Sequence, residues 1–99
     1  MKNSPAGAWL SQIETARSGA ELVRLMRDYV GGLSDEERAQ LPPDCRSHHI
    51  NAPADIQECA VTLAHGDLKA IGTPETTDAL RQAAVVFAAA AAKLTKVAG

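Results

Sequence analysis

The chain has 99 residues, which suits a single domain, and 45% of them are hydrophobic, which is enough for a globular fold. Nineteen of the hydrophobic residues are alanine and only three are aromatic, so large side chains can supply only a small part of the core. The formal net charge of −2, with no run of Lys or Arg, argues against a nucleic-acid binder.

The first half of the chain predicts two helices, because apolar residues recur at helical spacing and period-two alternation is nearly absent. The first helix should begin at Ser4-Pro5 and bury a face that carries Trp9 and Ile13. A capping-box pattern, Ser18 to Glu21, then starts a second helix or re-angles the first. Gly31-Gly32 should end it, since glycine adopts the left-handed conformation at helix ends without steric cost.

The middle of the chain alternates helix signals with proline. Ser34 to Glu37 is a second capping box, and Pro42-Pro43 should stop the short helix that follows it at Leu41. The stretch from Pro42 to Ala52 is predicted to be a loop, with Ile50 and Cys45 as the candidates that attach it to the core.

Two further helices are predicted in the second half. One enters at Asn51 or Ala52 and either continues through Gly66 or breaks there, and the last runs from Thr73 to about Val97. Short connections favour antiparallel neighbours. We therefore expect an all-α fold: one domain over residues 1–99, a compact bundle of four principal helices and one short one, with the long C-terminal helix central.

The last helix carries an unusual surplus of apolar residues. Its outward line should run through Gln82, Val86, Ala89, Lys93 and Lys96, so the middle of the helix is apolar all round. Either the other helices surround it, or its second face meets a partner protein or its own copy in a homodimer. A small chain cannot cover a central helix completely, which keeps the second interpretation open. The candidate interface residues are Val85, Val86, Ala89 and Ala92.

Metal-ligand and nucleophile residue types gather between Cys45 and Cys59, together with His48 and His49 and, further on, His65. The spacing is poor for zinc, because Cys59 and His65 point about 120° apart on one helix and structural sites prefer two tight pairs. Cys59 also falls on an apolar stripe, where a cysteine behaves as a small hydrophobe. We expect two free thiols, with a single disulfide between them as the alternative, and no metal, no cofactor and no catalytic residues.

Arg46, His48 and His49 form a small basic cluster within the predicted loop. They are candidates for contact with an anion or an acidic partner, and the alternative is a solvated loop.

The sequence thus predicts a small non-enzymatic protein that acts through protein–protein contacts, as an adaptor, a regulator or a small subunit. A thiol- or metal-dependent site in the Cys45–Cys59 segment is the alternative. With no leader-like segment and no apolar run longer than ten residues, a cytoplasmic location and no membrane association are expected. The Ala-rich, proline-punctuated composition is typical of small bacterial proteins.

Overall fold

The computed structural model describes residues 6–65 and 74–97, and within these ranges the chain forms helices and no β-strand. This confirms the predicted all-α compact bundle. Ser4-Pro5, Thr73 and the stretch around Gly66 lie outside the described residues. The elements are α1 (Ala6–Thr15), α2 (Gly19–Gly31), α3 (Asp35–Gln40), two 3-10 turns η1 (Pro43–Cys45) and η2 (Ser47–His49), α4 (Pro53–His65) and α5 (Pro74–Leu94).

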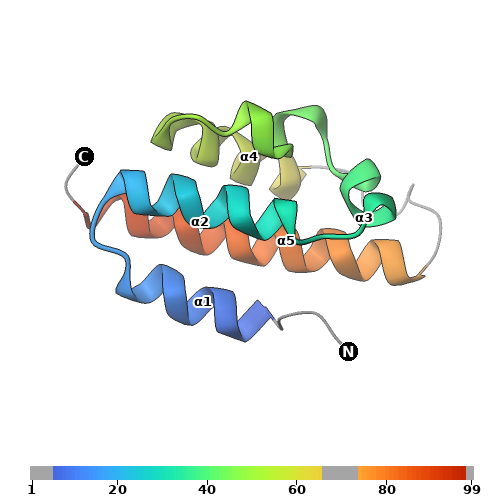
Figure 1. The fold of residues 1–99 in the computed structure, drawn as a ribbon, viewed down its shortest axis with the longest axis horizontal. Coiled ribbons are helices and arrows are strands. Elements are labelled where there is room, and N and C mark those ends of the chain that lie inside the picture. Colours follow the sequence, from blue (N-terminus) through green and yellow to red (C-terminus); the bar gives the residue numbers. More distant parts are fainter. Residues whose placement is uncertain (1–5, 66–73, 98–99) are drawn as a thin grey trace.

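The longest helix, α5, lies at the centre of the bundle, as predicted. It contacts α1, α2, α3 and α4, and in Figure 1 α1 and α4 lie on opposite sides of it, with α2 in front. Small side chains make this possible, because Ala83 and Ala90 are completely buried where neighbouring helices approach α5. The alanine content thus serves close helix packing in addition to helix propensity.

Both predicted N-cap serines are in place, but only the capping box at α3 is complete. At the start of α3, Ser34 Oγ accepts the N–H of Glu37 at 3.1 Å, and Glu37 Oε1 accepts the N–H of Ser34 at 2.9 Å. At the start of α2, Ser18 Oγ accepts the N–H of Glu21 at 3.2 Å, but the Glu21 carboxylate accepts from Arg17, at 2.8 Å. Ser18 therefore caps a new helix, and the Glu21 carboxylate binds the backbone of Arg17, the residue before that cap.

The end of α2 differs from the prediction. Gly32 caps the helix with φ −84° and ψ −7°, an ordinary right-handed conformation, and its N–H is shared between the carbonyls of Asp28 and Tyr29. No glycine among the described residues has a positive φ. The helix ends by tightening its last turn, so the expected left-handed cap was wrong.

The stretch from Pro42 to Ala52 is more regular than a loop, because η1 and η2 occupy most of it. Cys45 and Ile50 are fully buried and hold the segment to the core, as predicted. On the outside, Arg27 Nη1 on α2 donates to the carbonyl of Ile50 at 3.2 Å and to Asn51 Oδ1 at 3.1 Å. Asp55 Oδ2 then accepts the N–H groups of Asn51 and Ala52, each at 2.9 Å, which leads the chain into α4.

The three aromatic side chains form one continuous cluster in the core. Trp9 and Tyr29 meet edge to face with ring centroids 5.5 Å apart, and Tyr29 meets Phe87 in the same way at 6.3 Å. Burial, with a smaller contribution from the negative charge of Glu37, raises the pKa of the Tyr29 hydroxyl to about 12. Because one aromatic comes from each of α1, α2 and α5, the cluster joins the first two helices to the last one.

Candidate functional site

The outward line of α5 is shifted by one residue from the predicted line. Val86 is completely buried and belongs to the core, so it cannot contact a partner in the folded chain. Its neighbour Val85 is 52% exposed, and Ala88 and Ala92 are exposed one and two turns further along. Val86 therefore joins Ala83 and Ala90 on the buried side of α5.

A groove between α1 and α5 adjoins this line. Ala89 and Ala92, both predicted interface residues, line it together with Leu10, Ser11, Ile13, Glu14, Lys93 and Lys96. Lys93 Nζ donates to the backbone carbonyl of Glu14 at 2.6 Å, which ties the two helices together. We call the half-buried and exposed apolar residues on this side, Val85, Ala88, Ala89 and Ala92, the open face of α5.

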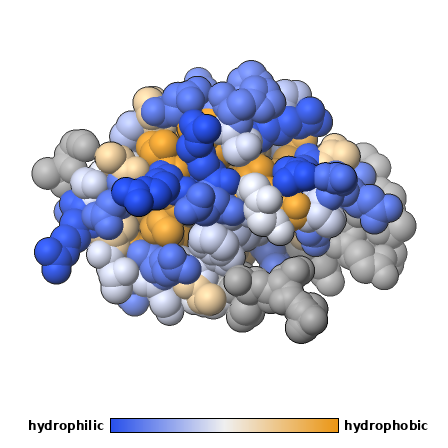
Figure 2. Space-filling view, in the orientation of Figure 1, coloured by the Kyte–Doolittle hydropathy of each residue, from blue (hydrophilic) through white to orange (hydrophobic). Residues whose placement is uncertain are grey.

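The opposite side of the bundle has a different character. Figure 2 shows the face that carries α2, where hydrophilic side chains run across the middle and hydrophobic ones show only in the gaps between them. Elsewhere, α4 exposes Val61, which is 57% exposed beside Gln57 and Glu58 in a shallow depression. Val61 shares this depression with Ala54, and the polar side chains of Gln57, Glu58 and Thr62 lie between and beside them.

The structure brings the two predicted thiol residues together in the core, whereas the predicted histidines are exposed. Cys45 and Cys59 are fully buried thiols, and Cys45 Sγ lies 3.8 Å from the carbonyl oxygen of Cys59. His48 and His49 are exposed, with ring centroids 4.3 Å apart. In residues 6–65 and 74–97, no three His, Cys, Asp or Glu side chains are grouped so that they could hold a metal ion.

The basic cluster gains a member that the sequence analysis missed. Arg46 and His48 line a depression together with Arg38, which comes from α3, whereas His49 does not line it. Arg38 follows the acidic first turn of α3, and only the packing of η2 beside α3 shows that it faces the same depression. Its position eight residues before Arg46 gave no periodic signal in the sequence.

Comparisons with protein-family models, with curated proteins and with solved structures find no match for this chain. Among the helices in the described part of the chain, none has the length and apolar character needed to cross a membrane.

Proposed function

We propose that this protein acts through protein–protein contacts, as an adaptor, a regulator or a small subunit, and that the open face of α5 is the contact surface. The observation that carries the proposal is the exposed line of Val85, Ala88 and Ala92 along the central helix. The inner rows of α5 are packed against four helices, while this line is apolar and faces outward.

The open face has the features of a helix-docking surface. Its alanines allow a partner backbone to approach closely, and Val85 would bury a branched side chain worth about 1 kcal/mol on contact. The adjoining groove supplies further apolar area from Leu10, with the ammonium groups of Lys93 and Lys96 at one edge. An apolar centre with a polar rim is the usual composition of a protein interface. An acidic amphipathic helix would suit both parts of the surface.

Site-specific photo-crosslinking tests the proposal. A photoreactive amino acid at position 85, in protein expressed in its native cells, should give a discrete crosslinked partner. The same amino acid at position 61 is a matched control, because Val61 and Val85 are similarly exposed. Equal, diffuse crosslinking from both positions would contradict the proposal.

Light scattering at increasing concentration then identifies the partner class. A dimer that Val85→Lys dissociates, and Val61→Lys does not, would show that the partner is a second copy. A monomer at every concentration would assign the crosslink to a different protein.

The thiol- or metal-dependent alternative has weaker support, because Cys45 and Cys59 are buried while His48 and His49 are exposed. A reactive cysteine must be accessible to its ligand or substrate, and neither of these thiols reaches the surface. Native mass spectrometry with and without a chelator tests this alternative, and a stoichiometric metal lost on chelation would revive it.

A further inference from the structure

A polar depression lies between α3 and the turn η2, well separated in sequence from the open face of α5. Its lining combines two arginines, a histidine and a serine with one acid and one alanine: Asp35, Arg38, Ala39, Arg46, Ser47 and His48. The two arginines come from different elements, so the fold itself brings their charges to one place.

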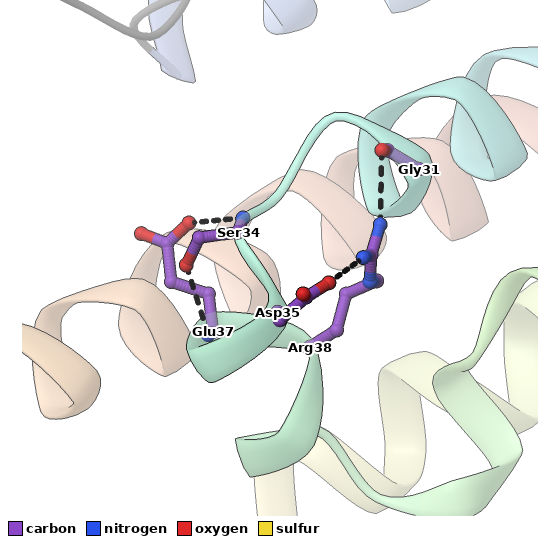
Figure 3. Close-up of polar contacts among 5 residues, drawn as sticks. All are labelled: Gly31, Ser34, Asp35, Glu37 and Arg38. Carbon is purple, nitrogen blue, oxygen red and sulfur yellow. Dashed lines mark hydrogen bonds and ion pairs between the residues drawn. The ribbon is translucent and has the colours of Figure 1, made fainter.

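Arg38 is held in position on one side of the depression. Its Nη1 donates to the carbonyl of Gly31, at the end of α2, at 3.1 Å, and its Nη2 forms an ion pair with Asp35 (Figure 3). A guanidinium group has five N–H donors, so these two contacts orient the group and leave donors for a ligand. The side chain of Asp35 is almost fully exposed, so solvent screening weakens its ion pair with Arg38.

Arg46 lies on the other side of the depression, where its backbone is hydrogen-bonded and its side chain is exposed. Its N–H donates to the carbonyl of Pro43 at 3.2 Å, and its own carbonyl accepts from His49 at 2.9 Å. The buried side chains of Cys45 and Ile50 anchor the segment around it. Within the described residues the Arg46 guanidinium has no hydrogen bond or ion pair, so no structural contact accounts for it.

We propose that this depression binds the phosphate group of a small phosphorylated molecule. Two guanidinium groups, the Ser47 hydroxyl and the His48 ring offer donors from two sides. The three peripheral oxygens of a phosphate monoester can accept from both sides at once, whereas a carboxylate presents two oxygens in one plane. Guanidinium groups also match phosphate geometry with paired hydrogen bonds. The site does not depend on the open face of α5.

Nuclear magnetic resonance titration tests the proposal, with inorganic phosphate as the probe and acetate at equal ionic strength as the comparison. Phosphate should shift the amide signals of Arg38 and of residues 46–48 in a saturable way, and acetate should bind at least several-fold more weakly. Arg46→Gln should weaken phosphate binding about tenfold, the effect expected for one charge-assisted contact. This variant should stay folded because the Arg46 side chain supports no other group.

Arg24→Gln is the matched control, because Arg24 is an exposed arginine on α2 that lines a different depression. It should bind phosphate as the parent chain does. An equal loss in both variants, or shifts that follow ionic strength alone, would overturn the proposal. Cosedimentation with phosphatidic acid vesicles, lost in Arg46→Gln and accompanied by no binding of free phosphate, would also overturn it, since the source would then be a lipid surface.

Discussion

The outer lines of α2 and α5 differ in composition. Both helices bury large apolar residues on their inner side, Leu22 and Met26 on α2 and Val86 and Phe87 on α5. On the outside α2 is charged, with Glu21, Arg24, Arg27 and Asp28 all exposed, whereas α5 exposes Val85, Ala88 and Ala92. The contrast is one of composition and not of burial, because each of the two helices has one side exposed to solvent.

The difference teaches that the central position of α5 does not explain all of its apolar residues. A helix that only served the core would carry polar residues on its outer line, as α2 does. The charged line of α2 also stabilises the fold, because Arg27 donates hydrogen bonds to Ile50 and Asn51 in the segment that leads into α4. No comparable hydrogen bond involves Val85, Ala88 or Ala92 within the described part of the chain, which is why we propose a partner for this line.

Substitutions at the neighbouring residues Val85 and Val86 should give the largest difference in unfolding free energy between the outer and inner sides of α5. Val86→Asp would place an unpaired charge in the core and should lower the free energy of unfolding by roughly 4 kcal/mol or more. Val85→Asp should change it by less than about 0.5 kcal/mol, because the side chain remains in solvent. Urea unfolding followed by circular dichroism measures both values.

Val86→Ala keeps that test usable if the charged variant does not fold. It removes two methyl groups from a packed site and should cost about 2 kcal/mol. Equal costs for the same changes at positions 85 and 86 would show that the two sides of α5 are not distinct.

Tyr29 is a titratable group on the buried side of α2. Because its hydroxyl is buried, we expect the protein to lose stability in alkali. Burial raises its pKa from the ordinary 10 to about 12, so the folded state favours the protonated hydroxyl. That stability is fully present below pH 10 and is lost as the pH rises towards 12. At about 1.4 kcal/mol per pKa unit, the rise from 10 to about 12 corresponds to a loss of roughly 3 kcal/mol.

Tyr29→Phe isolates the contribution of this hydroxyl, because it removes the titrating group and keeps the ring contacts with Trp9 and Phe87. The variant should lack the part of the alkaline destabilisation that comes from Tyr29. Since Tyr29 is the only tyrosine, its ionisation can also be followed directly by absorbance. An absorbance midpoint near pH 10 in the folded protein would show that burial does not protect the hydroxyl.

Much of the fold could be predicted from local signals in the sequence. Ser18 and Ser34 marked helix starts, and Pro42 marked a helix end, because caps and proline act within one turn. The conformation of Gly32 could not be predicted, since a glycine permits both a left-handed and a tightened right-handed ending. The turns η1 and η2 were missed because short 3-10 segments have no hydrophobic period.

The candidate sites were harder to predict, because they depend on how helices rotate and pack. The sequence could show that α5 had more apolar residues than one stripe needs, but a rotation of one residue decides whether Val85 or Val86 faces outward. Arg38 joins Arg46 only through the packing of η2 beside α3. Neither fact has a signature at fixed spacing along the chain.

The serine caps should give effects of about 1 kcal/mol that separate α2 from α3. Ser18→Ala should lower global stability by about 1 kcal/mol, because α2 is part of the core. Ser34→Ala should lower it less, since α3 contains no buried residue and can fray without unfolding the bundle. Amide hydrogen exchange distinguishes the two: faster exchange confined to α3 is expected for Ser34→Ala, and uniform acceleration would contradict this local fraying.

The smallest effect tests whether the charged outer line of α2 supports the fold. Arg27→Gln should destabilise the protein by about 0.5–1 kcal/mol, because an exposed guanidinium loses its hydrogen bonds to Ile50 and Asn51. Arg24→Gln removes an equally exposed arginine of the same helix and should change stability by less, within about 0.5 kcal/mol. Amide exchange in residues 47–52 should quicken only in the first variant, since Arg27 is the side chain that holds this segment against α2. If both variants behave alike, the charges of α2 serve solvation only, and the contrast with α5 rests on composition without a structural role on either side.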